Sequence, residues 1–162
     1  MDSFLHNITI VSLAPWDFVP YELLLLADPS RKMIQGYLQE SEMFVAQLNE
    51  ETIGILALLP LNAELAEIKN VAVAPELQGK GIGTALIQHA ERHAVAQGFL
   101  TLQIGTANSS FSELRLYQKL GFEISRIIPN FFVDNYQEPI IEDGIQAKHM
   151  IMLSKSLGAD MG

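Results

Sequence analysis

Apolar and polar positions alternate near the start of the chain and then change to a helical spacing. The segment His6 to Leu13 alternates and is rich in β-branched residues, which predicts a first strand that ends before Pro15. Val19 to Ala27 predicts a short helix, and Arg31 to Gln39 predicts a second one. The turn between them, Asp28-Pro29-Ser30, offers a side chain that can cap the second helix.

The middle of the chain predicts three strands followed by a helix. Two apolar runs, Met43 to Leu48 and Thr52 to Leu59, are separated by three polar residues, a pattern typical of a hairpin. Leu65 to Ala74 predicts the next strand. Gly83 to Gln97 has apolar residues at helical spacing and stops at Gly98, which predicts a helix with a glycine at its end.

The last third of the chain alternates between strands and helices. We expect a strand over Phe99–Gly105, a helix over Phe111–Leu120, and strands over Phe122–Val133 and Lys148–Leu153, with a loop between the last two strands. The order β-α-α-β-β-β-α-β-α-β-β, without repeat or linker, predicts a single mixed α/β domain over residues 1–157. Residues 158–162 are expected to form a disordered tail.

Composition and charge narrow the possible functions. The absence of cysteine excludes disulfides, thiolate metal sites and a cysteine nucleophile, and it fits a reducing compartment. The N-terminus does not resemble a signal peptide, and the most apolar run, Leu23 to Ala27, is too short to cross a bilayer. We therefore expect a cytoplasmic protein. The formal net charge of −9 repels nucleic acid and anionic membranes and attracts cations, although acidity can also serve solubility alone.

A glycine-rich loop, Gln78-Gly79-Lys80-Gly81-Ile82-Gly83, lies between a predicted strand and a predicted helix. Glycine lets the backbone approach a ligand closely, and the free N–H groups at a helix start bind anions. A Walker loop needs Ser or Thr where Gly81 stands, and a dinucleotide fingerprint needs G-x-G-x-x-G after the first strand rather than G-x-G-x-G after the fourth. The alternative is a tight turn that binds nothing, although three alternating glycines are costly for a turn alone.

Two segments resemble one enzyme family. The stretch from Ile68 to Leu86 resembles motif A of the GNAT superfamily of acyl-CoA-dependent N-acyltransferases, whose signature is matched at Gln78, Gly81 and Gly83. The segment Leu116-Tyr117-Gln118-Lys119-Leu120-Gly121-Phe122 is similar to the Leu-Tyr-x-Lys-x-Gly-Phe of the same family. The resemblance implies a central, mostly antiparallel twisted sheet, with strands 4 and 5 splayed apart and about four flanking helices.

The resemblance also implies how acetyl-CoA is held. Backbone N–H groups of the glycine loop would bind the pyrophosphate, and the fourth strand would pair through its backbone with the pantetheine arm, as an added strand does. The implied contacts are Val71, Ala72, Val73, Gln78, Gly79, Lys80, Gly81, Ile82, Gly83, Thr84 and Asn108. Many relatives carry an asparagine at the position of Ser110, so Asn108 takes that role here only if the loop is two residues longer.

Acyl transfer to an amine needs a base, a polarised carbonyl and an acid. Since cysteine is absent, direct attack of the amine on acetyl-CoA in a ternary complex is the simplest path. The resemblance places Tyr117 near the CoA sulfur, which makes it the candidate general acid, with a core tyrosine as the alternative. Glu67 stands where some protein-modifying relatives carry a catalytic glutamate, which makes it the candidate base, with a solvent-facing strand residue as the alternative. The N–H of Val73, or of a neighbour at a strand bulge, is expected to polarise the carbonyl.

The remaining polar residues bear on metals and on the acceptor. His89 and His93 share a helix face, but Glu91 is not in the H-E-x-x-H position and no third ligand is evident, so we expect no metal. The resemblance implies that the first helices and the last loop form the acceptor pocket, and acidic and aromatic side chains there would suit a cationic amine; the alternative for each of them is an ordinary polar loop residue. These side chains are Asp17, Tyr21, Glu22, Asp28, Tyr136, Glu138 and Glu142.

These observations predict an N-acetyltransferase that moves acetyl from acetyl-CoA to a primary amine of a small molecule or peptide, with a homodimer as a possible assembly. The alternatives are a non-catalytic acyl-CoA-binding or regulatory module and a plain nucleotide-binding protein.

Overall fold

A computed structural model describes residues 4–158, and the chain divides into two compact units, Met1–Phe99 and Leu100–Gly162. The first unit contains β1 (Ile8–Ser12), α1 (Tyr21–Ala27), α2 (Arg31–Leu38), β2 (Glu42–Leu48), β3 (Glu51–Pro60), β4 (Leu65–Val73) and α3 (Ile82–Ala96), with short 3-10 turns η1 (Leu5–Asn7) and η2 (Pro75–Leu77). The second contains β5 (Thr101–Ala107), α4 (Phe111–Lys119), β6 (Glu123–Ile128), α5 (Phe131–Asn135), β7 (Ile141–Glu142), β8 (Ile145–Gln146) and β9 (Met150–Ser156).

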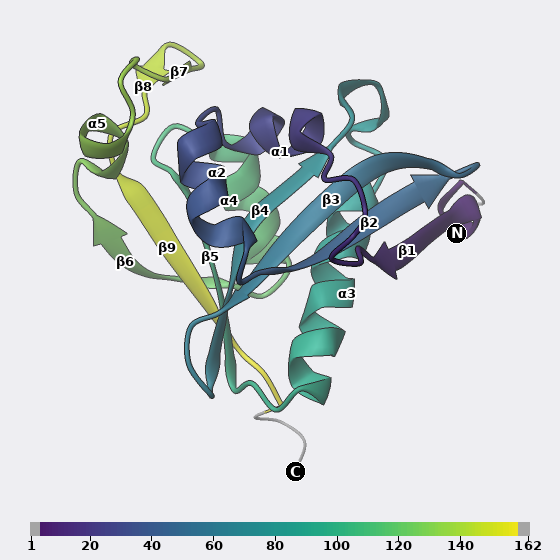
Figure 1. The fold of residues 1–162 in the computed structure, drawn as a ribbon. Coiled ribbons are helices and arrows are strands. Elements are labelled where there is room, and N and C mark those ends of the chain that lie inside the picture. Colours follow the sequence, from purple (N-terminus) through teal and green to yellow (C-terminus); the bar gives the residue numbers. More distant parts are fainter. Residues whose placement is uncertain (1–3, 159–162) are drawn as a thin grey trace. The chain divides into compact units, whose positions relative to one another are not determined.

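The first unit is an antiparallel sheet in the order β1-β2-β3-β4, with helices on both faces. Helices α1 and α2 contact one face and α3 contacts the other (Figure 1). Strand β3 is therefore buried on both faces, which explains why it is a continuous apolar run instead of an alternating one. The β2–β3 turn places Asn49 and Glu50 at φ 52° and 69°, the left-handed conformation that a two-residue hairpin needs.

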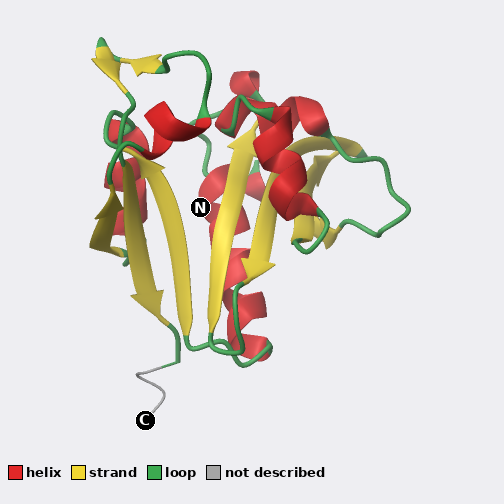
Figure 2. Cartoon of the chain, turned by 60° about the vertical axis from the view of Figure 1, so that its left-hand side comes forward, coloured by secondary structure: helices red, strands yellow, loops and turns green. Residues whose placement is uncertain are grey.

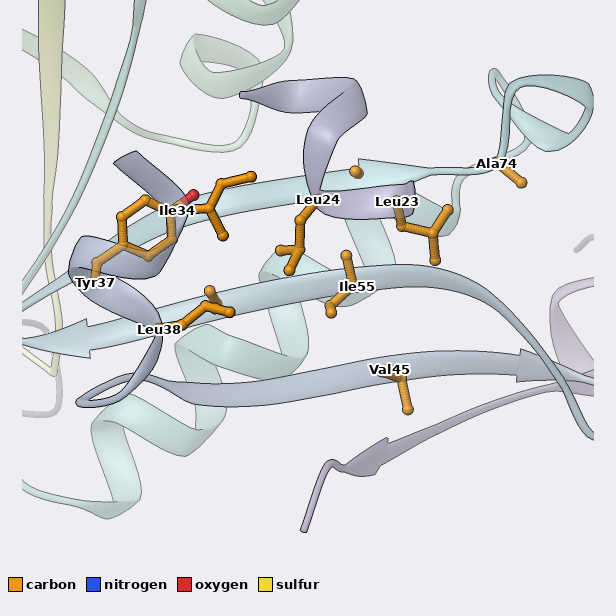
Figure 3. Packing of buried hydrophobic residues seen from close by; sticks show 10 residues of the cluster. Leu23, Leu24, Ile34, Tyr37, Leu38, Val45, Ile55 and Ala74 are labelled. Carbon is orange, nitrogen blue, oxygen red and sulfur yellow. The ribbon is translucent and has the colours of Figure 1, made fainter. Parts of the chain in front are cut away.

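The core of the first unit on the α1–α2 face is a cluster of apolar side chains from both helices and three strands (Figure 3). Leu24 and Ile34 have no exposed surface; Leu24 lies beside Ile55 of β3, and Ile34 lies near Tyr37. Helix α2 begins as predicted, because the Ser30 hydroxyl accepts a hydrogen bond from the N–H of Met33 at 3.1 Å.

The second unit has β9 between β5 and β6, with both pairings antiparallel (Figures 1 and 2). Leu153 of β9, for example, pairs with Ile104 of β5 and with Ile124 of β6. The small hairpin β7–β8 turns at Asp143 and Gly144, with φ values of 52° and 75°. It was predicted only as a loop, although Asp-Gly is a strong hairpin signal.

The mixed α/β fold is confirmed, with some corrections. The predicted strand Phe122–Val133 is too long: β6 ends at Ile128, and α5 follows Asn130, which has a φ of 58°. Pro129 cannot donate a ladder hydrogen bond, and asparagine tolerates the left-handed conformation, so the strand stops there. The described residues contain five α-helices, one more than expected.

Some expectations remain predictions. They are the single domain over 1–157 and the splay of strands 4 and 5. The expected tail 158–162 lies, apart from Gly158, outside the described residues. Within residues 4–158, no helix is long and apolar enough to cross a membrane.

Candidate active site

The glycine loop joins β4 to α3 in a conformation that its glycines permit. Gly79 has a φ of 78° and Gly81 a φ of 93°, and Gly81 is the N-cap of α3. Residues with a Cβ rarely adopt a positive φ, so the turn itself requires glycine at both positions. A Cβ at Gly79 would meet nothing within 4 Å, and one at Gly81 would meet Leu5 at 3.4 Å.

The start of α3 presents unused hydrogen-bond donors. The first main-chain bond into the helix runs from the N–H of Ala85 to the carbonyl of Gly81, at 3.0 Å. Among the described residues, no acceptor is found for the N–H groups of 79–84, and Gly81 supplies no side-chain cap. Free N–H groups at the positive end of a 15-residue helix form an anion site, which fits the pyrophosphate role expected for Gln78 to Thr84.

Side chains of the loop hold it in place beside β4. The Gln78 amide donates to the carbonyl of Val73 at 3.0 Å, so this side chain fixes the loop instead of pointing outward. The Lys80 ammonium lies 5.6 Å from the Phe4 ring centre. Val71 and Val73 pair with β3 along one edge of β4, so backbone pairing with pantetheine would use the opposite edge of the strand.

A β-bulge in β4 brings the candidate base to the face of the sheet that α1 and α2 cover. Leu58 of β3 pairs with Ile68 and Ala57 pairs with Asn70, so Lys69 is the extra residue. An extra residue inverts the alternation of side chains on one side of the bulge. Glu67, whose partner Leu59 packs against the α1–α2 core, therefore shares a face with Asn70, which bonds to α1 and α2.

Glu67 belongs to a polar network under α1 and α2. It is 9% exposed, and its Oε2 lies 3.3 Å from the Lys69 ammonium, which lies 5.6 Å from the Tyr37 ring centre. The Tyr37 hydroxyl, turned toward β4 (Figure 3), accepts from the Asn70 amide at 3.0 Å and donates to Asp28 at 3.5 Å. Burial, above all, raises the pKa of Tyr37 well above its ordinary value, so it stays a neutral donor.

Asn70 links this network to the backbone of α1, since its Nδ2 also donates to the carbonyl of Leu24 at 3.0 Å. Its Oδ1 is buried without a hydrogen-bond partner among the described residues. Sequence reasoning missed Tyr37, Lys69 and Asn70. The sequence did contain a signal for them: a polar residue at a position where the pattern expects an apolar one indicates a buried polar group, and such a group needs a hydrogen-bond partner.

Tyr117 lies on α4 in the second unit and is 5% exposed. Its ring packs edge-on against Phe122, with centroids 6.4 Å apart. Burial raises the pKa of Tyr117 well above 10, and the nearby negative charge of Glu113 raises it further. The phenol is therefore protonated at neutral pH, as a proton donor must be, and packing holds its ring in one orientation.

Asn108, also in the second unit, already has structural bonds. Its Oδ1 accepts from the N–H groups of Lys148 and His149 at 2.8 and 2.9 Å, and its Nδ2 donates to the carbonyl of Gln146 at 3.2 Å. Within residues 4–158, the Nδ2 group has no second acceptor, and the contact of Asn108 with the cofactor stays a prediction. The hydroxyl of Ser110, at the position of the relatives' asparagine, donates to Glu142 at 2.7 Å.

The two histidines of α3 contact residues of β2. Their rings pack edge-on against Phe44, and His93 also lies 3.0 Å from a carboxylate oxygen of Glu42. Among the described residues, no group of three or more His, Cys, Asp or Glu side chains could hold a metal. Burial, together with the charges of Arg92 and His93, lowers the pKa of His89 below 6.5.

The lowered pKa of His89 predicts how stability depends on pH. As pH falls through about 6.5, the unfolded chain takes up more protons at this imidazole than the folded protein does, so the free energy of unfolding should decrease. Urea unfolding at about pH 7.5 and about pH 5.5 measures the decrease. His89→Gln should reduce it, and the exposed His6→Gln is the control. An identical decrease in His89→Gln would contradict this account.

Comparisons with known proteins agree with this geometry. The family model described as Acetyltransferase (GNAT) family matches residues 10–122. The N-acetyltransferase YvbK of Bacillus subtilis is 44% identical over 133 residues, which cover 82% of this chain and 86% of YvbK. The structure of a GNAT family acetyltransferase from Elizabethkingia anophelis with acetyl-CoA bound is 47% identical, with a TM-score of 0.91 over 93% of this chain and 99% of that one. A Bacillus subtilis acetyltransferase in complex with CoA is 40% identical, with a TM-score of 0.87 and the same coverage.

Proposed function

Because the chain belongs to the GNAT family of acetyltransferases, we propose that it transfers acetyl from acetyl-CoA to a primary amine by direct attack within a ternary complex. Acetyl-CoA is the co-substrate. The observation that carries the proposal is the row of N–H groups at the start of α3 that have no acceptor within residues 4–158, in a loop that Gly79 and Gly81 allow to form. An anion as compact and charged as a pyrophosphate satisfies them.

We assign the steps to groups on the protein. Glu67 takes a proton from the bound ammonium, directly or through water, which frees the nitrogen lone pair. The nitrogen attacks the thioester carbon, a C–N bond forms, and the C–S bond breaks. Tyr117 gives its proton to the departing sulfur, and the nitrogen, which carries one proton too many for an amide after the attack, loses that proton to restore the Tyr117 phenol. These roles rest on the burial of both side chains and on the family motif that contains Tyr117.

Glu67→Gln should lower kcat/KM for the amine by about 10²-fold or more, because an amide cannot accept the proton. The dissociation constant of acetyl-CoA, measured by calorimetry, should not change. Glu64→Gln is a matched control, since Glu64 precedes the same strand and is exposed. Equal activity of Glu67→Gln and the wild type would remove Glu67 from the mechanism.

The direct test is release of CoA thiol with a panel of primary amines, together with detection of the acetylated amine by mass spectrometry. Tight acetyl-CoA binding without release for any amine would favour the alternative, a non-catalytic acyl-CoA-binding module. Thermal stabilisation by ATP but not by acetyl-CoA would instead support a nucleotide-binding protein.

We also propose a cytoplasmic location and a homodimer. The lack of cysteine supports a reducing compartment. Fractionation of cells and sedimentation of the purified protein test these two proposals separately.

A further inference from the structure

Glu67, the proposed base, forms an ion pair with Lys69. The Oε2 of Glu67 and the Nζ of Lys69 are 3.3 Å apart, and their side chains are 11% and 30% exposed. The pair is therefore mostly desolvated but open on the lysine side. A charge in such a place needs a partner, because removing one member leaves the other buried and uncompensated.

The bulge is the reason that this lysine lies beside this glutamate and next to Asn70. Lys69 is the residue without a partner in the β3–β4 register, and bulges re-aim a side chain. Its ammonium lies 5.6 Å from the centre of the Tyr37 ring, and Tyr37 is held by Asn70 at 3.0 Å. The Tyr37 ring, fixed by its hydrogen bond with Asn70, therefore favours one position of the Lys69 ammonium.

This arrangement restricts the charge of the acceptor. A simple ammonium that approaches Glu67 would make two cations share one carboxylate, and among the described residues no second carboxylate forms an ion pair with Lys69. The other carboxylate near Tyr37, Asp28, already accepts from the Tyr37 hydroxyl and from the N–H of Ser30. An acceptor with its own anionic group removes the conflict, because its ammonium pairs with Glu67 and its anion pairs with Lys69.

We infer that the acceptor is a zwitterion with an acidic group near its primary amine, such as an amino acid, and that Lys69 binds this acidic group. The inference rests on the proposed function, since it names the acceptor class for the same site. It also reverses the expectation drawn from the net charge of −9, which favours simple cationic amines over zwitterions.

The test is a panel of matched acceptors, each set consisting of an amino acid, its amide and its decarboxylated amine. Leucine, phenylalanine and methionine provide three such sets, and β-alanine and γ-aminobutyrate vary the spacing of the two charges. kcat and KM are measured from thiol release for the wild type, Lys69→Met, Lys69→Arg and Lys32→Met. Lys32 is an exposed lysine of α2, so its removal changes the net charge equally.

The wild type should prefer the zwitterion in each accepted set. Lys69→Met should lower kcat/KM for zwitterions by about tenfold to a hundredfold more than for the matching amides and amines, mainly through KM, because only the zwitterions lose a partner for their acidic group. Lys69→Arg should keep the preference, and Lys32→Met should behave as wild type. Unfolding temperature and acetyl-CoA affinity show whether each variant is folded.

Two results would overturn the inference while leaving the proposed function intact. One is acetylation of amides or amines in preference to zwitterions by the wild type. The other is an equal loss on all members of a set in Lys69→Met. Failure of every acceptor, with acetyl-CoA bound, would overturn the proposed function and the inference with it.

Discussion

Gly81→Glu is expected to abolish detectable acetyl-CoA binding in a protein that still folds. The substitution places a carboxylate at the N-cap of α3, among the N–H groups proposed to bind the pyrophosphate. Like charge in the anion site opposes binding, and the side chain occupies the approach that glycine leaves open. Isothermal titration with acetyl-CoA measures the loss, and circular dichroism shows whether the fold remains.

The chain offers a matched control for this substitution at the other end of the same helix. Gly98 has a φ of 92°, close to the 93° of Gly81, and a Cβ there would meet nothing within 4 Å. Gly98→Glu therefore adds the same backbone strain and the same charge away from the loop. It should lower stability and bind acetyl-CoA normally. If Gly81→Glu binds acetyl-CoA as well as Gly98→Glu does, the pyrophosphate does not lie at this loop.

Tyr117→Phe should lower kcat by about 10²-fold or more with no change in the affinity for acetyl-CoA. The substitution keeps the ring that packs against Phe122 and removes only the hydroxyl, so the fold should be preserved. Stopped-flow or thiol-release measurements at saturating acetyl-CoA give the change in kcat, and thermal unfolding gives the change in stability.

The raised pKa of Tyr117 adds a second expectation. Because the pKa of Tyr117 is raised, the phenol keeps its proton up to and beyond pH 10. Ionisation of Tyr117 should therefore cause no decrease of kcat at any pH below 10. A wild-type kcat that falls below pH 10 in a step that Tyr117→Phe abolishes would contradict the raised pKa. An unchanged kcat in Tyr117→Phe would make this residue a core tyrosine.

Local sequence signals predicted the parts of the fold and site that depend on local chemistry. Gly79 and Gly81 could be placed in a loop because few other residues adopt positive φ. The cap of α2 could be narrowed to Asp28 or Ser30, and the structure shows that it is Ser30, whose hydroxyl accepts from the N–H of Met33. The same type of signal, Asp143-Gly144, was present in the last loop, and the hairpin it predicts was missed there.

The polar network could not be predicted, because it depends on pairing between distant residues. The bulge at Lys69 is a property of the β3–β4 register, and without it Glu67 and Asn70 would lie on opposite faces of β4. The contact from Asn70 to Tyr37 joins a strand to a helix 33 positions away in sequence. No periodicity within β4 or α2 contains that information.

The central claim, direct transfer from acetyl-CoA to an amine in a ternary complex, is tested most directly by incubating the protein with acetyl-labelled acetyl-CoA, first alone and then with an amine that it accepts. We predict no label on the protein and no CoA release in the first step, followed by equimolar CoA and acetylated amine in the second. Stoichiometric CoA release and label on the protein before the amine is added would contradict the claim.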